Sequence, residues 1–487
     1  MSDSEQHDVF QSVFTARYSR NSVLLRVFSE RHRIELWRQL WTWLAQAEME
    51  LGVARITTDA VAAMRAQQSN IDWSFVAERE RHVRHDVMAH IGAYERVCPQ
   101  AAGIIHLGAT SCFVTDNADL LILREAITEI EHRLVVCVAR LDDFAEEHKG
   151  RPTVGRTHYQ AASITTVGKR ALLWLQSLLF ALRDLQAAKR ELRFRGCKGA
   201  TGTQDSFLTL FDGDAHKVCR LDARVSELAG FAGVGASFVV TGQTYDRMLD
   251  ARLVNALATL AAAVHRCCLD LRILQATGEL LEPFECGQVG SSAMPYKRNP
   301  MRAERCCGLA RYLMSLPANT LNTAALQGFE RTLDDSANRR LVLPDAFLAA
   351  DTLLTTFQNI VEGLQVVVDV TAGHVAAELP FLALERVLMR LTQLGASRQE
   401  AHEKIRAVSL RAKERQSHGD PVELVGMLQN DPFFESVREF AADLCKNPLS
   451  FAGRCVEQVD EFHKNEVAPI LDAYPHVRNT KRATLEV

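Results

Sequence analysis

The sequence predicts an all-α fold whose centre is a bundle of long helices. Apolar residues recur three, four or seven positions apart over most of the 487 residues, a spacing that places them on one face of an α-helix. The alternation of apolar and polar residues that marks a half-buried strand is nearly absent. Long periodic stretches with few strands are typical of an extended helical bundle.

The predicted helices follow in chain order. The first covers 34–51 and ends before Gly52, a natural C-terminal stop. The second starts at Asp116, a suitable N-cap, and continues to Gly150, so at 1.5 Å per residue it spans roughly 50 Å. Further periodic stretches predict long helices at 165–194, 246–277 and 344–364.

Segments rich in glycine, proline and small polar residues separate these helices. They cover 151–160, 198–206 and 286–300, and their composition predicts loops. Beyond Val370 the periodic stretches are shorter, and one of them opens with a capping box. The capping residues are Ser397 and Glu400.

These boundaries predict three domains. They are an N-terminal helical domain at 1–111, the central bundle at 112–364 with a functional loop at 286–305, and a C-terminal helical domain at 365–487. The residues from Arg478 onward are expected to form a frayed tail.

Charge and cysteine content exclude several classes of protein. Lysine and arginine (56) nearly balance aspartate and glutamate (60), and the net charge of -4 lacks the basic character of nucleic-acid-binding proteins. The twelve cysteines contain no CxxC pair, which favours reduced thiols over zinc ligands. The polar N-terminus lacks a secretory signal, and the apolar run at 171–182 is too short to span a membrane. We expect a cytoplasmic protein without membrane or nucleic-acid partners.

The segment 290–305, GSSAMPYKRNPMRAER, carries the strongest chemical signal. Its glycine, serines and prolines give a loop with exposed hydroxyl and N–H groups, and its lysine and arginines supply positive charge for an anionic ligand. Lys297 is close enough in sequence to ease the ionisation of Ser291, which is otherwise too weak an acid to act as a base. From spacing alone, a solvated basic loop explains the pattern equally well.

This segment resembles the signature of the fumarase/aspartase superfamily, and its second half is similar to the adenylosuccinate lyase family. Other blocks similar to that family occur in the family's order: HLGATSCFVTDN at 106–117, RTHYQ at 156–160, KGATGTQ at 198–204, TGQTY at 241–245 and FERTLDDSANRR at 329–340. The resemblance extends over most of the chain. It implies an all-α, three-domain superfamily fold whose central long-helix bundle assembles into a homotetramer.

The resemblance also implies a reaction. Adenylosuccinate lyases eliminate fumarate from adenylosuccinate, giving AMP, and from succinylaminoimidazole carboxamide ribotide, giving aminoimidazole carboxamide ribotide. Breaking the C–N bond requires a base for the proton beside a carboxylate, a stabiliser for the resulting dianion, and an acid for the leaving nitrogen.

By the same resemblance, Ser291 is the base, and Lys297 and Asn299 stabilise the developing charge. His158 is the acid and is oriented by Glu304, while His85 lies near the phosphate or succinyl group. The other implied substrate contacts are Arg17, Tyr18, Arg84, Asp86, Thr110, Ser111, Thr157, Gln243, Arg305, Arg331, Ser336 and Arg340. Many are arginines, whose planar fork grips phosphate or carboxylate. The blocks of His85, His158 and Ser291 would come from three different subunits.

The histidines of RHVRHDVMAH at 81–90 also suggest a metal site. The segment is not HExxH, and the implied elimination needs no Lewis acid if a lysine and helix N-termini stabilise the anion. We therefore predict no metal and no organic cofactor.

The chain departs from the family pattern in three places. Ala161, Ala162 and Ser163 replace a Pro-Ala-Gln run, which predicts the loss of a rigid turn and an amide behind His158. Asp205 stands where alanine is common, and Gly328 replaces an aromatic residue.

Two alternative functions stay open at this point. Argininosuccinate and fumarate-type lyases share the serine loop, but they lack the blocks at 84–90 and 329–340. A non-catalytic structural homologue would be expected to lose the base, acid or lysine, whereas Ser291, His158 and Lys297 are all present.

Overall fold

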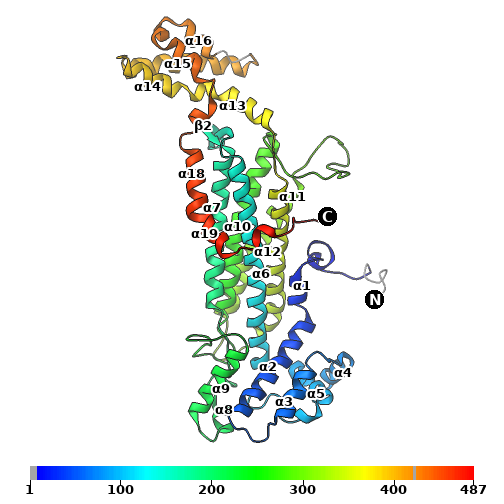
Figure 1. The fold of residues 1–487 in the computed structure, drawn as a ribbon. Coiled ribbons are helices and arrows are strands. Elements are labelled where there is room, and N and C mark those ends of the chain that lie inside the picture. Colours follow the sequence, from blue (N-terminus) through cyan, green and yellow to red (C-terminus); the bar gives the residue numbers. More distant parts are fainter. Residues whose placement is uncertain (1–7, 421–423, 487) are drawn as a thin grey trace.

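A computed structural model describes residues 8–420 and 424–486 as an elongated, mainly helical molecule (Figure 1). Its centre is a bundle of long helices, with one group of shorter helices at each end of the bundle. The all-α prediction is therefore confirmed. The long helices of the bundle are α6 (Ser111–Glu147), α7 (Val167–Glu191), α10 (Met248–Ala276), α11 (Met301–Ala325) and α12 (Asp334–Glu362).

One continuous apolar core holds the bundle together. It is filled by aliphatic and aromatic side chains such as Trp41, Trp174, Phe347 and Phe357, all of which are buried. Burial of each such side chain stabilises the fold by about 1.5–3 kcal/mol. The core explains the helical period in the sequence, because each long helix presents an apolar stripe to its neighbours.

Two helix starts differ from the sequence prediction. Helix α6 begins at Ser111, because Thr110 is extended and serves as its N-cap. Asp116, the predicted cap, is buried and paired with Arg247 instead. Helix α12 begins at Asp334 and passes through Pro344, which was predicted as its first residue. A proline removes one backbone hydrogen bond, and the tertiary packing on both sides of α12 outweighs that loss.

The end of the bundle where α6 begins is covered by the N-terminal helices and by a short pair from the middle of the chain (Figure 1). η2 (Phe14–Tyr18) and α1 (Val23–Val27) lie beside the bundle. The elements at its end are α2 (Glu30–Glu50), α3 (Thr58–Ala66), α4 (Trp73–Val83), α5 (Asp86–Val97), η3 (Pro99–Ala101), α8 (Asp205–Leu210) and α9 (Ala215–Leu228). Helix α2 packs into the main core through Trp37, Leu40 and Trp41. It confirms the helix predicted over 34–51.

The opposite end carries the C-terminal helices, which have a separate small core. They are α13 (Val368–Leu382), α14 (Leu384–Gln393), α15 (Arg398–Ser417), α16 (Leu424–Asn430), η4 (Pro432–Val437), α17 (Arg438–Leu444) and η5 (Pro448–Phe451). The capping interaction of Ser397 is confirmed, because its hydroxyl accepts the N–H of Glu400. The three-domain division itself stays a prediction.

The chain then returns to the bundle through α18 (Cys455–Phe462), η6 (His463–Val467), α19 (Ala468–Ala473) and η7 (Val477–Asn479). The following residues do not form the predicted frayed tail. Arg140 donates to the carbonyl of Thr480 at 2.7 Å, Asn359 donates to that of Ala483 at 2.7 Å, and the N–H of Ala483 donates to Glu362 at 2.8 Å. Side chains of α6 and α12 thus fix the tail through its backbone.

The segment predicted as a loop at 151–160 is largely strand. β1 (Pro152–Thr157) and β2 (Gln160–Thr166) form an antiparallel hairpin beside α13. A second short pair joins β3 (Leu280–Leu281) to β4 (Gln365–Val366). Ala161 and Ser163 lie in β2, so these departures from the family pattern occupy a strand and not a turn. The predicted loop at 286–300 forms no helix or strand, and the one predicted at 198–206 ends at 204, because Asp205 and Ser206 already belong to α8.

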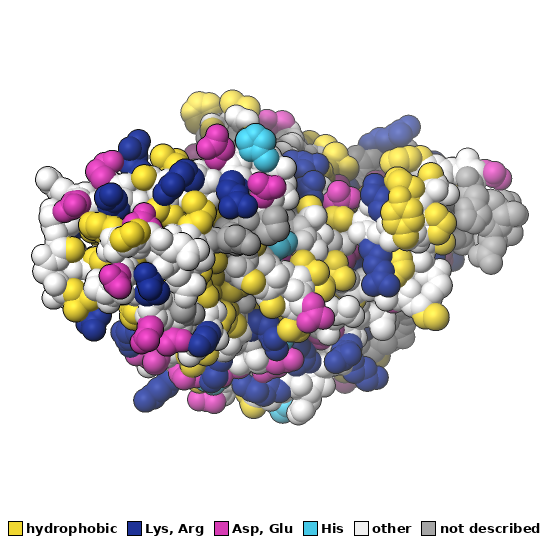
Figure 2. All heavy atoms as spheres, turned by 90° about the horizontal axis from the view of Figure 1, so that it is seen from above, with side chains coloured by type: hydrophobic (Ala, Val, Ile, Leu, Met, Phe, Trp, Pro, Cys, Tyr) yellow, Lys and Arg dark blue, Asp and Glu magenta, His cyan; other side chains and the backbone are white. Residues whose placement is uncertain are grey.

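The surface carries interspersed charges. In the view along the bundle, basic and acidic side chains are mixed, with apolar side chains between them (Figure 2). In the part of the chain that the structure describes, no helix combines the length and apolar character needed to cross a membrane.

Candidate functional site

A cavity of about 670 Å³ lies where α4 and α5 meet the first turns of α6 and α12. Several predicted site residues line it together: Arg84, His85, Asp86, Ser111, Gln243, Arg331, Ser336 and Arg340. They come from four segments that are far apart in sequence. Thr110 is adjacent, as the N-cap of α6. The structure therefore brings together about half of the predicted site.

The turn between α4 and α5 positions His85. Arg84 ends α4 in the left-handed conformation (φ 54°), and His85 then caps α5, its Nδ1 accepting the N–H of Met88 at 3.4 Å. Its Nε2 lies 3.3 Å from Oγ of Ser111. Because Nδ1 accepts, the ring proton of the neutral imidazole is assigned to Nε2, which donates to Ser111.

Arginines surround the mouth of this cavity. Arg340 is exposed and lies 3.2 Å from Asp86, and Arg331 lies 2.7 Å from Asp335. Arg84 lines the same cavity, so these three guanidinium groups border it together with His85 and Ser111. Such a cluster suits an anionic ligand, because guanidinium groups bind carboxylate or phosphate through paired hydrogen bonds.

A buried ion-pair network forms the floor. Arg247 donates to both oxygens of Asp116 at 3.0 and 3.1 Å, and to Asp335 at 2.7 Å. Burial alone would raise the pKa of Asp116, but the charges of Arg247 and Arg339 outweigh burial and lower it. This network was not predictable from the sequence. Its only sequence signal is the placement of charged residues within otherwise apolar helix faces.

Gln243 is held by a contact between two loops that requires a glycine at position 202. Its side-chain N–H donates to the carbonyl of Ala200 at 3.0 Å, and its oxygen accepts from Cys112. Gly202 has φ 85° and lies directly against the Thr241 carbonyl, so that no side chain fits there. The KGATGTQ and TGQTY blocks therefore pack on each other at the cavity wall. Asp205, one of the departures, opens the short helix α8 that follows.

His158 lies elsewhere, at the tip of hairpin β1–β2. His158 (φ 51°) and Tyr159 (φ 60°) form a two-residue turn between the paired residues Thr157 and Gln160. Both central residues have positive φ, as in a type I′ turn, which normally requires asparagine or glycine. His158 is exposed to solvent in this strained turn, and strained backbone of this kind is concentrated at functional sites.

A buried carboxylate anchors the hairpin. Glu279 accepts from Arg156 at 2.8 Å and from the hydroxyl of Thr153 at 3.0 Å, both on β1. Burial would raise the pKa of Glu279, but the nearby charge of Arg156 outweighs burial and lowers it. The carboxylate therefore stays ionised and fixes the strand that leads to His158.

The serine loop precedes α11. Oγ of Ser291 accepts the N–H of Met294 at 3.2 Å and that of Ala293 at 3.4 Å. Asn299 donates to the carbonyl of Gly290 at 2.8 Å, which closes the loop at its base. Lys297 is exposed, and Glu304, in the first turn of α11, lies 3.8 Å from Arg272. The two backbone N–H groups directed at Oγ would also stabilise an oxyanion there.

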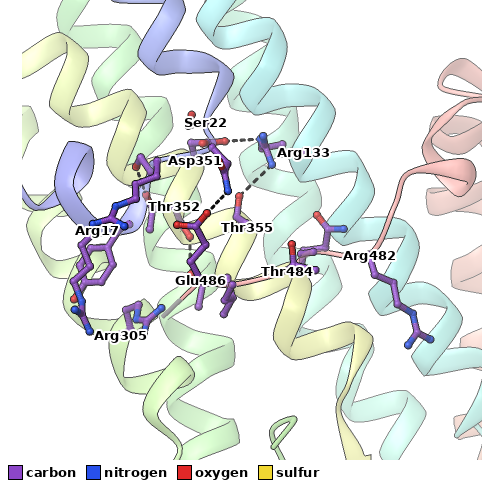
Figure 3. Close-up of a pocket in the computed structure, with 18 of the residues that line it drawn as sticks. Arg17, Ser22, Arg133, Arg305, Asp351, Thr352, Thr355, Arg482, Thr484 and Glu486 are labelled. Carbon is purple, nitrogen blue, oxygen red and sulfur yellow. Dashed lines mark hydrogen bonds and ion pairs between the residues drawn. The ribbon is translucent and has the colours of Figure 1, made fainter. Parts of the chain in front are cut away.

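A second, smaller pocket contains Arg17, Tyr18 and Arg305 (Figure 3). The guanidinium of Arg305 lies over the Tyr18 ring at 5.1 Å. The C-terminal tail closes one side, where Glu486 accepts from the amide of Asn21 at 2.5 Å. These three predicted contacts thus lie in one pocket, which is separate from the cavity that contains His85.

Within one chain, His158 does not meet His85. Ser111 begins α6, and hairpin β1–β2 follows the other end of that helix (Figure 1). The 37 residues of α6 separate the two ends by about 55 Å. The serine loop lies on the hairpin side of the bundle. A single subunit therefore presents parts of the predicted site in separate places.

The other histidines of the 81–90 segment have different surroundings. His82 contacts the backbone carbonyl of Glu78, and His90 is buried edge-on against Trp37 and Trp73. Burial lowers the pKa of His90 to about 4, so it is neutral. Among the described residues, no group of three or more His, Cys, Asp or Glu side chains is arranged to hold a metal ion.

Comparison with known proteins gives a consistent result. A family described as "Lyase" matches residues 4–314, and one described as "Adenylosuccinate lyase C-terminus" matches 380–462. The chain is 51% identical to adenylosuccinate lyase of Caenorhabditis briggsae, over 96% of this chain and 97% of the nematode protein. It is 46% identical to that of Saccharomyces cerevisiae, over 99% of both chains.

Solved structures resemble the fold. A fumarate lyase from Mesorhizobium sp. BNC1 superposes with a TM-score of 0.79 at 21% identity, covering 94% of this chain and all (100%) of that one. The 3-carboxy-cis,cis-muconate lactonizing enzyme from Pseudomonas putida superposes with a TM-score of 0.77 at 24% identity, over 92% of this chain and 98% of that one. At these identities the likeness concerns the fold alone.

Proposed function

The chain belongs to the adenylosuccinate lyase family, and from this premise we propose that it cleaves adenylosuccinate into AMP and fumarate. The same elimination on succinylaminoimidazole carboxamide ribotide releases fumarate and the carboxamide ribotide. The observation that carries the proposal is the similarity over nearly the whole chain to adenylosuccinate lyases of a nematode and a yeast. The arginine-rich cavity beside His85 supports it, because both substrates carry carboxylate and phosphate groups.

In the proposed mechanism, Ser291 removes the proton from the carbon beside a carboxylate of the succinyl group. The electron pair moves into that carboxylate, and Lys297 and Asn299 stabilise the dianion. The C–N bond then breaks, fumarate forms, and His158 donates a proton to the departing nitrogen, with Glu304 orienting the imidazole. The N–H groups of Ala293 and Met294 at Oγ of Ser291 favour its ionised form.

The substrate is held by residues of the two pockets. Ser111 and Thr110, at the N-terminus of α6, bind a succinyl carboxylate, since a helix N-terminus offers unpaired N–H groups to an anion. Arg84, Asp86, Gln243, Arg331, Ser336 and Arg340 complete this pocket, with His85 near the phosphate or succinyl group. Arg17, Tyr18 and Arg305 in the second pocket, and Thr157 beside His158, supply the remaining contacts.

A complete site then needs more than one subunit. We propose a homotetramer in which the blocks of His85, His158 and Ser291 come from three subunits. The separation of His158 from Ser111 by the length of α6 supports sharing. Large apolar side chains exposed on the bundle helices support assembly. They include Leu173, Phe180, Leu269, Tyr312, Met314, Leu321 and Leu341.

The proposed chemistry uses no metal and no organic cofactor, because a lysine and helix N-termini supply the positive potential. We place the enzyme in the cytoplasm. The twelve cysteines support this, since all are free thiols and most are buried.

A single assay tests the function. Purified protein is mixed with adenylosuccinate, and the loss of its ultraviolet absorbance is followed, with argininosuccinate as the control substrate. We expect cleavage of adenylosuccinate alone. Cleavage of argininosuccinate alone would identify a different lyase, and cleavage of neither would support a non-catalytic homologue.

A further inference from the structure

Asp335 stands at the centre of the buried network beneath the cavity. It lies in the first turn of α12, and its side chain is fully shielded from solvent. Each of its oxygens has its own partner: Oδ2 accepts from Nε of Arg247 at 2.7 Å, and Oδ1 accepts from Nη1 of Arg331 at 2.7 Å. Asp335 thus bridges a buried arginine to one that lines the cavity.

Arg247 is a fixed support and not a ligand-binding group. Its other two guanidinium nitrogens donate to Asp116 of α6, and only 1% of its side chain is exposed. Each of its three guanidinium nitrogens therefore has a partner inside the protein. Because it also precedes α10, it ties α6, α10 and α12 together at one point.

Arg331 differs from Arg247 in its exposure and in its hydrogen bonding. It lies in the segment between α11 and α12, outside any regular element, and 21% of its side chain is exposed to the cavity. Among the described residues, its only hydrogen bond or ion pair is the one to Asp335. Its other guanidinium nitrogens are available to a ligand, but their direction depends on that single carboxylate.

The charges explain why a carboxylate is needed. Arg247 and Arg331 are both cations and share Asp335, so a neutral residue at 335 would leave them facing each other without an anion between them. A long arginine side chain without a partner also has many rotamers, and holding one of them for a ligand costs free energy on binding. A neutral residue at 335 would therefore weaken ligand binding through both effects, without changing the groups that carry out the reaction.

We propose that Asp335 is a positioning residue for the reaction: by bridging Arg331 to Arg247 it directs the Arg331 guanidinium at an anionic group of the substrate. This inference rests on the proposed function and deepens it. In this arrangement Arg331 contacts the substrate, and Asp335 fixes the orientation of the Arg331 side chain. The Asp335 side chain itself has no solvent-exposed surface, although it lies at the cavity wall.

A double-mutant cycle tests the proposal. Asp335→Asn, Arg331→Gln and the double variant are compared with the wild type in steady-state cleavage of adenylosuccinate. We expect Asp335→Asn to raise KM roughly tenfold with kcat changed less than about threefold, since a charge-assisted hydrogen bond is lost from the binding side only. In the Arg331→Gln background, the same substitution should change KM by less than about twofold, because the residue through which it acts is gone.

Asp250 provides the matched control. It is buried in the same network and accepts from Arg339 at 2.7 Å and from Tyr245 at 2.7 Å, without contacting Arg331. Asp250→Asn should lower the unfolding temperature as Asp335→Asn does, but leave KM within about twofold of wild type. An equal rise in KM for Asp250→Asn, or an undiminished effect of Asp335→Asn in the Arg331→Gln background, would overturn the proposal.

If Asp335→Asn fails to fold, Asp335→Glu keeps the charge and extends the arm by one methylene. This variant should still raise KM severalfold, because the Arg331 guanidinium is displaced although its ion pair survives. An unchanged KM would show that only the charge at 335 matters and would overturn the positioning role. The wild-type assay separates this outcome from failure of the proposed function, in which the wild type itself would not cleave adenylosuccinate.

Discussion

The hydroxyl oxygen of Ser111 lies 3.3 Å from Nε2 of His85, although the two residues open different helices. The contact joins the N-terminus of α5 to that of α6, so both helix ends face the same cavity. The imidazole is thereby held from both sides, by the Met88 N–H at Nδ1 and by Ser111 at Nε2.

This contact predicts the effect of Ser111→Ala. Loss of the hydroxyl leaves Nε2 of His85 without its partner and removes one donor for the substrate carboxylate. We expect kcat/KM to fall roughly tenfold or more with little change in unfolding temperature, because the hydrogen bond is solvent-accessible. Thr128→Ala on the outer face of α6 is the control, and equal activity of the two variants would contradict the prediction.

Ser291→Ala should abolish turnover while leaving substrate affinity within about tenfold, since loss of a base raises the barrier without removing phosphate and carboxylate contacts. Calorimetric titration measures the affinity and the ultraviolet assay the rate. The neighbouring exposed Ser292→Ala should retain most of the activity. A Ser291→Ala protein with a tenth of the wild-type rate, or without binding, would refute the assignment.

Treatment with a strong chelator should leave activity unchanged, because the histidines of 81–90 have separate surroundings in this fold. The protein is dialysed against the chelator and assayed before and after addition of zinc or magnesium. Activity that disappears and is restored by metal would show that a metal participates.

The shared-site proposal predicts complementation. His158→Ala and Ser291→Ala proteins are each expected to be inactive, but subunit exchange between equal amounts should restore roughly a quarter of the sites, if each site takes the two residues from different subunits. Ser291→Ala mixed with Lys297→Ala is the control. Both residues lie in one loop, so exchange cannot rebuild that loop. Verified mixed tetramers of the first pair that stay inactive would place both residues of a site on one chain.

Glu48 predicts a pH-dependent stability. It is fully buried in α2, and in the described part of the chain no group donates a hydrogen bond to either oxygen. Burial raises its pKa well above the ordinary value of 4.5. The folded state therefore holds a proton that the unfolded state loses, and stability falls as pH rises from 4.5 towards the raised pKa.

Glu48→Gln removes this dependence, because glutamine has the shape of the protonated acid. We expect the variant to be more stable than wild type at pH 8 by at least about 1 kcal/mol, with the difference vanishing near pH 4.5. Urea unfolding at the two pH values measures it. A difference that is the same at both would show that Glu48 does not titrate on unfolding.

The long helices were predictable because their apolar period extends over many turns, as in α2 and α10. The hairpin was not, because its strands are short and its turn is His158-Tyr159, which lacks the usual glycine or asparagine. The order of the tail was also not predictable from the sequence, since α6 and α12 hold it mainly through its backbone.

The site was predictable only in part. The family blocks identified the residues around the cavity, but spacing could not show that Asp116, Arg247 and Asp335 meet beneath it. Asp116 is 131 residues from Arg247, and each of the three alone is an ordinary charged residue in a helix or at its end. Their relation depends on how α6, α10 and α12 pack.

The length of α6 affects how the enzyme can be inhibited and how its activity should respond to dilution. His158 lies beyond one end of this helix and Ser111 at the other, so under the shared-site proposal an isolated subunit would hold no complete site. Specific activity should therefore depend on total enzyme concentration, falling when dilution favours dissociation. A small molecule that wedges between the bundle helices of two subunits would inactivate the enzyme without resembling a nucleotide, and excess substrate would not compete it away.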